Sequence, residues 1–191
     1  MFCNAPHGLS ARWIPPHENN RIPLACRCLL IEESNGRKVL FETGIGAFFP
    51  PKLRQRYGVN EANHVLLHNL ATIGYKSDDI DIIVLSHLHF DHAGGLLSEW
   101  VEDSPLTLAF PSAHYVVGES AWTRACAPHP RDKASFIPEL HTLLQDSKRL
   151  EIVPQGGTSQ ILGEKYSFRI SNGHTPGQLH TVIEGADDPI I

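Results

Sequence analysis

The chain has 191 residues, of which 41% are hydrophobic and 19% charged, enough for one sizeable core, so a single domain over residues 1–191 is expected. With 16 Lys and Arg against 21 Asp and Glu, the net charge is −5, and this acidic balance disfavours nucleic acid as a partner. The unusual feature is the presence of 12 histidines. Because histidine is the commonest side-chain metal ligand, this excess suggests a metal site.

The cysteines and the apolar runs indicate the cellular location. Four cysteines are too few for a disulfide framework, so reduced thiols are expected. Cys26 and Cys28 lie two residues apart in an apolar run, which favours packed core side chains on one face of a strand over a metal site. No signal peptide and no apolar run of about eighteen residues is visible, so we expect a cytoplasmic protein with no membrane partner.

The first part of the chain predicts an antiparallel pair of strands. Residues 22–31 and 39–42 are apolar runs on either side of Asn35-Gly36. An Asn-Gly between two such runs is a strong hairpin signal, because both positions tolerate positive φ.

Two helices are expected next. Pro50-Pro51 predicts the start of a short helix, and Asn60 is a plausible N-cap for a second helix over 61–73. His64 and His68 are expected along the solvent-facing edge of this second helix.

The remaining chain alternates strands and helices. Residues 80–86 are largely β-branched and nearly continuous in apolar character, which indicates a buried strand. Further strands are expected near 113–117, 150–153, 166–171 and 179–184, and helices near 119–126 and 135–144. The mixture predicts an α/β or α+β layered domain rather than a helical bundle.

The chemistry is concentrated directly after the strand at 80–86, where His87, His89, Asp91 and His92 fall within six positions. His87 and His89 can point the same way from an extended segment, while Asp91 and His92 lie where the chain turns, so the four side chains can be shared between two adjacent ions. Imidazole and carboxylate are ligands that Zn²⁺ accepts. Gly94-Gly95 is expected to turn the backbone sharply away from the metals.

This His-x-His-x-Asp-His pattern resembles the signature of the metallo-β-lactamase-fold hydrolase superfamily. The segment Asn172-Gly173-His174-Thr175-Pro176-Gly177 resembles the third metal-ligand motif of that family, in the form found in its lactonase and glyoxalase II branches. Phe41-Glu42-Thr43-Gly44 resembles a strand-end motif in which Asp usually precedes Thr-Gly, and Glu42 stands at that position here. The resemblance implies an αββα sandwich.

The same resemblance implies a role for each matched residue. His87, His89 and His174 would hold the first metal, and Asp91 and His92 would begin the second. Glu42 would orient a metal ligand. The expected cofactor is one or two Zn²⁺ ions, with iron or manganese as the other candidates, and a metal-bound hydroxide would attack an ester-like bond, such as a lactone or thioester, in a small molecule. Asp91 would act as the catalytic residue that orients the hydroxide and passes its proton to the leaving group.

The resemblance further implies a chain that stops early. The family's second half supplies a bridging Asp and a last His, and few residues follow His174. Asp187 and Asp188 are expected in a solvated turn rather than as ligands. We therefore expect a sandwich that lacks its C-terminal strands, and a homodimer that covers the exposed sheet edge.

Two alternatives to the hydrolase stay open from the sequence. One is a catalytically inactive fragment that keeps a partial metal site. The other is an iron-dependent oxidoreductase of the same fold, because a set of His and Asp ligands can also hold Fe(II).

Overall fold

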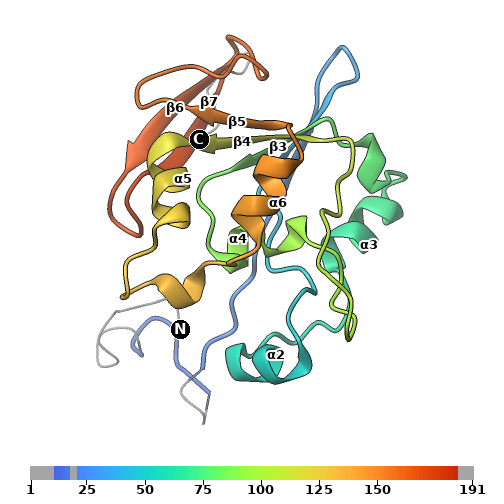
Figure 1. Ribbon diagram of the computed structural model, residues 1–191, viewed down its shortest axis with the longest axis vertical. Helices are drawn as coiled ribbons and strands as arrows, with labels where there is room; N and C mark the ends of the chain where they lie inside the picture. Colours follow the sequence, from blue (N-terminus) through green and yellow to red (C-terminus); the bar gives the residue numbers. More distant parts are fainter. Residues whose placement is uncertain (1–10, 18–20, 185–191) are drawn as a thin grey trace.

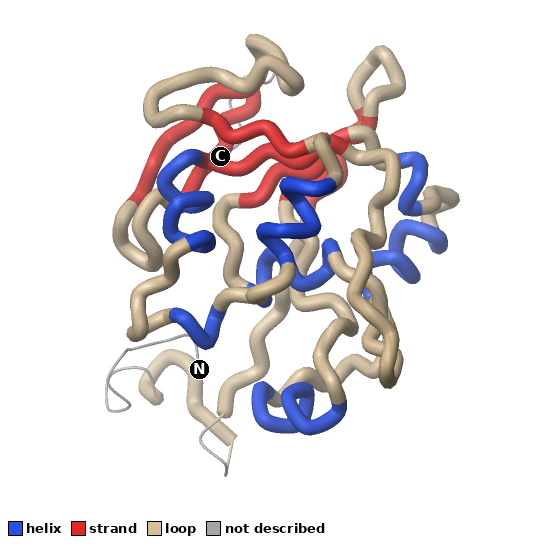
Figure 2. Tube along the Cα trace, in the orientation of Figure 1, coloured by secondary structure: helices blue, strands red, loops and turns tan. Residues whose placement is uncertain are grey.

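The computed structural model describes residues 11–17 and 21–184 of the chain. Figures 1 and 2 show strands gathered on one side of the molecule and helices beneath them. The turn expected at Asp187 and Asp188 lies outside the described residues. Within the described part of the chain, no helix is long and apolar enough to cross a membrane.

The main sheet has five strands in the order β1-β2-β3-β4-β5. The first two form the antiparallel hairpin predicted around Asn35-Gly36, and the strands from β2 to β5 pair in parallel. Their bounds are β1 (Leu29–Glu32), β2 (Lys38–Phe41), β3 (Ile82–Leu85), β4 (His114–Gly118) and β5 (Leu150–Val153). All four residues of β3 are buried, as expected for a central strand covered on both faces.

A second sheet covers one face of the first. It consists of β6 (Tyr166–Ser171) and β7 (Gln178–Ile183), paired antiparallel. Between the two sheets lies an apolar cluster drawn from strands of both and from the loop before β6. Its buried members are Val39, Ile82, Val84, Val116, Val153, Leu162 and Tyr166.

The helices lie on the opposite side of the main sheet from the second sheet, as Figure 1 shows. They are α2 (Pro51–Tyr57), α3 (Val65–Thr72), α4 (Phe90–Ala93), α5 (Glu119–Cys126) and α6 (Leu140–Asp146). Since side chains alternate along a strand, Ile83 and Leu85 of β3 join Leu70, Trp122 and Leu144 in a helix-side core. The layers therefore run helices, five-stranded sheet, two-stranded sheet, which confirms the α/β layered sandwich.

The start of α3 differs from the sequence prediction. The helix begins at Val65, and its N-cap is His64 rather than Asn60. His64 is buried, not solvent-facing: its Nδ1 accepts a hydrogen bond from the Leu67 N–H at 3.3 Å, and its Nε2 lies 2.9 Å from the carbonyl oxygen of Gly95. The prediction failed because a buried carbonyl from a distant loop needs a donor, and the imidazole supplies it.

The helix expected at 135–144 is also shifted. The chain forms a 3₁₀ turn at Lys133–Ser135 and then α6 from Leu140. Pro138 lies between them, and proline lacks an N–H and disfavours helical backbone in the residue before it.

Candidate metal centre

The first two histidines of the His-x-His-x-Asp-His motif lie directly after the end of β3. After Leu85 the chain leaves the sheet, and His89 has extended backbone as the N-cap of α4. The side chains of both His87 and His89 are almost completely buried. A central strand that ends against a short helix thus holds two imidazoles in the interior of the molecule.

Gly94 and Gly95 do not form the sharp turn that was predicted. Gly94 has ordinary right-handed helical backbone, and both glycines form the 3₁₀ turn that continues α4. A Cβ atom at Gly95 would lie 2.0 Å from the carbonyl oxygen of Thr43, and one at Gly94 would lie 2.3 Å from that of Ile45. The glycines therefore permit a close backbone approach between α4 and the segment after β2.

Thr43 holds α4 in this position. Its backbone N–H and its hydroxyl both donate hydrogen bonds to the carbonyl oxygen of His92, at 2.9 and 2.8 Å. The strand-end motif at β2 and the histidine motif after β3 are therefore joined through the backbone of His92.

Three of the predicted ligands form one group. His87, His89 and His174 each offer a ring nitrogen, and these three atoms all lie within 4.8 Å of one another. His174 comes from the segment before β7, and its Nε2 lies 3.3 Å from Nδ1 of His89. The fold thus brings together residues that are separated by more than eighty positions in the sequence.

The state of these rings fits a divalent metal. Nδ1 of His87 lies 2.9 Å from the hydroxyl of Ser86, whereas its Nε2 is buried without a hydrogen-bond partner among the described residues. Burial lowers the pKa of His87 to about 2 and that of His89 to about 4, with neighbouring histidines acting in the same direction. Both rings are therefore neutral at neutral pH, which is the form that binds a metal.

Asp91 and His92 lie beside this group. The ring centroids of His92 and His87 are 4.1 Å apart, and Nε2 of His92 lies 3.6 Å from Oδ2 of Asp91. The other carboxylate oxygen of Asp91, Oδ1, is buried without a hydrogen-bond partner in the described part of the chain. Over residues 11–17 and 21–184, no second group of three His, Cys, Asp or Glu ligands surrounds this pair.

Glu42 contacts His92 from the other side. Its Oε2 lies 3.2 Å from Nδ1 of His92, and its Oε1 accepts a hydrogen bond from the N–H of Ser86. Burial alone would lower the pKa of His92, but the close contact with the Glu42 carboxylate and its charge, with the charge of Asp91, outweigh burial and raise that pKa.

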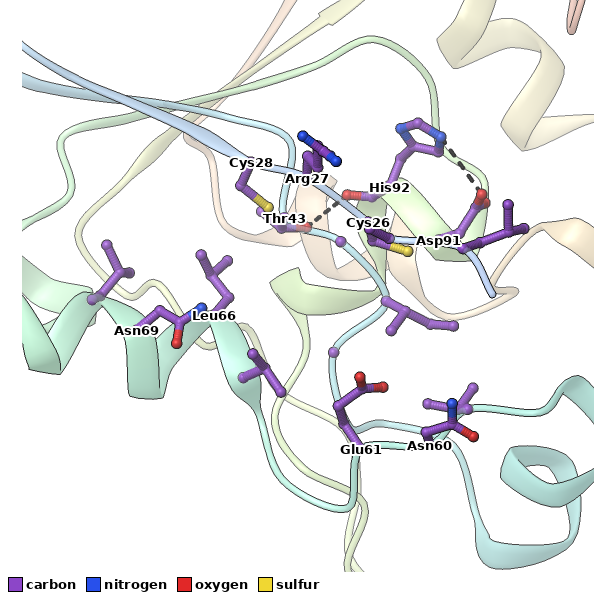
Figure 3. Close-up of a pocket in the computed structure, with 18 of the residues that line it drawn as sticks. Cys26, Arg27, Cys28, Thr43, Asn60, Glu61, Leu66, Asn69, Asp91 and His92 are labelled. Atoms are coloured by element: carbon purple, nitrogen blue, oxygen red, sulfur yellow. Dashed lines mark hydrogen bonds and ion pairs between the residues drawn. The ribbon is translucent and has the colours of Figure 1, made fainter. Parts of the chain in front are cut away.

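A large cavity reaches this centre. It has a volume of about 910 Å³, and its lining includes Asp91 and His92. Figure 3 shows these two side chains on one side of the cavity and Glu61, Leu66 and Asn69 on the other. Further lining comes from residues 43–46 and 57–60 and from the segment 22–28, which precedes β1.

Cys26 and Cys28 are part of this cavity wall. Cys28 packs against the helix-side core as expected, whereas Cys26 is exposed, which corrects the assignment of Cys26 to the core. Both are free thiols, Cys26 exposed and Cys28 half-buried. Burial, with the charge of Glu42, raises the pKa of Cys28 to about 12; burial and the charges of Asp91 and Glu61 raise that of Cys26. The thiols are therefore protonated at neutral pH and are poor nucleophiles.

Sequence reasoning missed several residues that support the centre. Ser86 fixes the ring of His87, Thr43 holds α4, and His64 holds the Gly95 carbonyl. Ser86 directly precedes the histidine motif and Thr43 lies within the strand-end motif, so their positions were a signal. Nothing in the helical pattern around His64 indicates a contact with Gly95.

Comparison with known proteins decides the family. The model of the metallo-beta-lactamase superfamily matches residues 21–191. The chain belongs to the metallo-β-lactamase superfamily. An N-acyl homoserine lactonase from Bacillus thuringiensis is 25% identical over 194 residues, covering 95% of this chain and 66% of the lactonase.

Solved structures agree with the superfamily fold. A probable metal-dependent hydrolase from Staphylococcus aureus matches with a TM-score of 0.81 and 25% identity, over 99% of this chain and 64% of that one. A dizinc quorum-quenching lactonase has a TM-score of 0.60 at 24% identity, over 85% of this chain and 53% of that one, and supports the fold alone. The chain spans about two thirds of the length of the curated lactonases that it matches.

Proposed function

We propose that the protein is a zinc-dependent hydrolase of an ester-like bond, such as a lactone or thioester, in a small molecule. The observation that carries the proposal is the convergence of His87, His89 and His174, with ligand atoms within 4.8 Å of one another beside a large cavity. Three histidines with room for a further ligand are a donor set typical of catalytic zinc. The lactonases among the relatives support the choice of bond.

In this proposal the three histidines hold one zinc ion, and Asp91 and His92 contribute to a second position. A zinc ion bound there supplies Lewis acidity, which polarises a carbonyl and lowers the pKa of a water molecule. Iron or manganese would be held by the same donors.

Asp91 is the proposed catalytic residue. Its Oδ1 is buried and free of hydrogen-bond partners among the described residues, so it can accept a proton from the water that attacks the carbonyl carbon. When the bond between this carbon and the leaving oxygen or sulfur breaks, Asp91 returns the proton to the leaving group. Glu42 orients His92 through its contact with Nδ1.

The cavity supports a substrate with an apolar part. Its lining includes Ile22, Leu24, Leu66 and Ile73, while Asp91 and His92 form a polar side. A substrate would place its reacting carbonyl at Asp91 and bury its hydrocarbon against the segment 22–28 and α3.

The proposal is tested with the purified chain. We expect elemental analysis to find at least one zinc per chain, and a chelator to abolish hydrolysis on a panel of lactones and thioesters. The variants His87→Ala and His174→Ala should lose both zinc and activity, whereas His68→Ala, which removes an exposed histidine of α3, should retain both. Wild-type protein that binds neither zinc nor iron would contradict the proposal.

A second candidate is a metal-binding chain without turnover. It is favoured by the observation that the described residues form a single three-ligand group, with no second such group around Asp91 and His92. Stoichiometric zinc with no hydrolysis across the panel would select this candidate. Bound iron together with oxygen uptake would instead select an oxidoreductase.

A further inference from the structure

The loop between α5 and α6 places a carboxylate next to the histidine centre. Asp132 lies at the start of the 3₁₀ turn Lys133–Ser135, within a segment that no motif of the sequence singles out. One of its oxygens, Oδ2, accepts two hydrogen bonds from the guanidinium of Arg124 on α5, from Nε at 3.1 Å and from Nη2 at 2.8 Å. Two bonds to one oxygen fix the direction of the whole carboxylate.

The second carboxylate oxygen of Asp132 is not engaged by the residues of its own loop. Oδ1 is buried and has no hydrogen-bond partner among the described residues. A buried carboxylate oxygen without a hydrogen bond destabilises the folded state. We therefore expect a neighbouring side chain to donate a hydrogen bond to Oδ1 when its donor atom is oriented towards it.

His89 offers the matching donor. Its Nδ1 faces Nε2 of His174 across 3.3 Å, so Nδ1 is the atom directed into the ligand group. Its Nε2 is on the opposite side of the ring, buried and without a partner among residues 11–17 and 21–184. When Nδ1 binds a metal, the ring proton must reside on Nε2, which then needs an acceptor.

The same loop packs directly on His89. The ring of Phe136 stands edge-on to the ring of His89 with centroids 4.7 Å apart, and the backbones of these two residues form an antiparallel bridge. The negative charge of Asp132 is among those that act on His89. The acceptor Oδ1 of Asp132 and the donor Nε2 of His89, neither of which has a hydrogen-bond partner among the described residues, therefore lie on adjoining segments. They are close enough for the charge of Asp132 to act on His89.

We propose that Asp132, held by Arg124, is a positioning residue that accepts the Nε2–H of His89 when Nδ1 of that ring binds the metal. The inference rests on the metal binding in the proposed function and assigns to the α5–α6 loop a direct part in it. The carboxylate fixes the tautomer and orientation of the ring and raises the basicity of Nδ1. Phe136 keeps water away from the pair.

The test measures zinc affinity rather than hydrolysis. Wild-type protein, Asp132→Asn and Asp132→Ala are compared by competition with a chromogenic zinc chelator. We expect both substitutions to weaken zinc binding by about 10–100-fold, the range found for carboxylates that support a ligating histidine. Glu139→Gln serves as the control, since Glu139 is an exposed carboxylate of the same loop and should leave the affinity unchanged.

A spectroscopic measurement separates positioning from a general structural role. In the zinc-loaded protein, the Nε2 proton of His89 should give an NMR signal that is protected from exchange with water, and Asp132→Ala should remove this protection. Arg124→Gln, which frees the carboxylate without removing it, should weaken zinc binding by a smaller factor.

Two outcomes overturn the inference, and they can be told apart. If wild-type protein binds zinc and both Asp132 variants bind it within about two-fold as tightly, with the His89 signal still protected, the positioning role is wrong and the proposed function stands. If wild-type protein binds no metal, the proposed function fails and the inference fails with it.

Discussion

The carboxylate oxygen Oε2 of Glu42 lies 3.2 Å from the ring nitrogen Nδ1 of His92. Glu42 occupies the position at which the strand-end motif of the family usually has the shorter Asp. Its backbone has a φ of 62°, in the left-handed region that non-glycine residues rarely occupy. Glu42 also accepts the N–H of Ser86, so one side chain joins the ends of β2 and β3. The longer carboxylate therefore still reaches the histidine motif.

Glu42→Gln should lower the pKa of His92, because Gln removes the charge that raises it while keeping an acceptor for the Ser86 N–H. A raised histidine pKa stabilises the fold below the unfolded value of about 6.5, and this contribution disappears as the pH rises through the folded value. We expect the variant to lose about 1–2 kcal/mol at pH 5.5 and less at pH 8.5. An NMR titration of His92 and denaturation of metal-free protein at both pH values measure these effects; an equal loss at both would contradict the assignment.

Zinc should stabilise the folded chain through the three-histidine group. A ligand that binds only the folded state adds about 2.7 kcal/mol at a concentration one hundred times its dissociation constant. Thermal unfolding with and without zinc should show a clear rise in Tm for wild-type protein and a much smaller one for His174→Ala. His68→Ala should behave like wild type, and a similar rise in all three proteins would place zinc elsewhere.

The parts of the fold that could be predicted have local causes. Alternating or continuous apolar character marks the strands around Ile83 and Ile170, and Asn35-Gly36 marks the hairpin. The motif from His87 to His92 indicated a metal site, because four metal-ligating side chains within six positions at a strand end have few other uses. Two of them, His87 and His89, lie together with His174 in the structure. These signals are confined to short stretches of sequence.

The parts that could not be predicted depend on contacts between distant segments. His64 is polar and lies in a helical pattern, and only the buried Gly95 carbonyl explains its burial. The apolar run that contains Cys26 was expected in the core, but the residues before β1 leave the sheet and line the cavity instead. Local pattern cannot distinguish a strand from an extended cavity wall of the same composition.

Gly95→Ala should disrupt the junction between α4 and the strand-end motif. The added Cβ would meet the carbonyl oxygen of Thr43 at 2.0 Å, and backbone on both sides leaves little room to adjust. We expect a loss of at least about 3 kcal/mol in the free energy of unfolding, together with weaker zinc binding. Gly156→Ala is the control, because Gly156 has positive φ but open space around it, and should cost about 1–2 kcal/mol through backbone strain alone. Equal losses in the two variants would show that the close approach is not needed.

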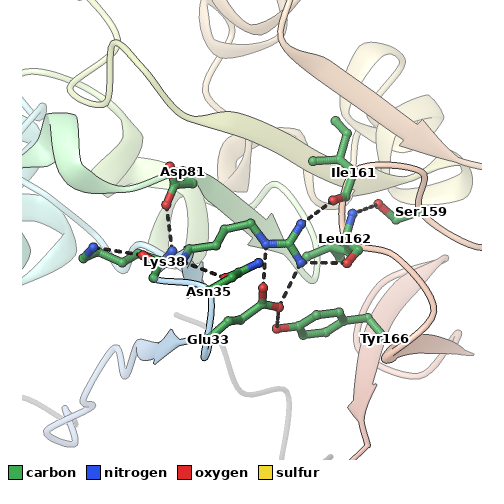
Figure 4. A network of polar contacts seen from close by, with 10 residues as sticks. Glu33, Asn35, Lys38, Asp81, Ser159, Ile161, Leu162 and Tyr166 are labelled. Carbon is green, nitrogen blue, oxygen red and sulfur yellow. Dashed lines mark hydrogen bonds and ion pairs between the residues drawn. The ribbon is translucent and has the colours of Figure 1, made fainter.

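A polar network joins the β1–β2 hairpin to the second sheet, as Figure 4 shows. Arg37 donates to both carboxylate oxygens of Glu33 and to the carbonyl oxygens of Ile161 and Leu162, and the hydroxyl of Tyr166 donates to Glu33. The hydrogen bond from Arg37 lowers the pKa of Glu33. Partial burial acts in the opposite direction, and the hydrogen bond from Tyr166 lowers the pKa further.

Glu33→Gln should therefore destabilise the chain in a manner that depends on pH. A lowered carboxylate pKa stabilises the fold above the unfolded value of about 4.3, and this stabilisation is lost as the pH falls through the folded value. We expect a cost of about 1–3 kcal/mol at pH 7 that shrinks towards pH 3. Urea denaturation of wild type, Glu33→Gln and the exposed control Glu164→Gln across this range measures the difference. A cost at pH 3 as large as that at pH 7 would show that the ionised carboxylate does not tie the hairpin to the second sheet.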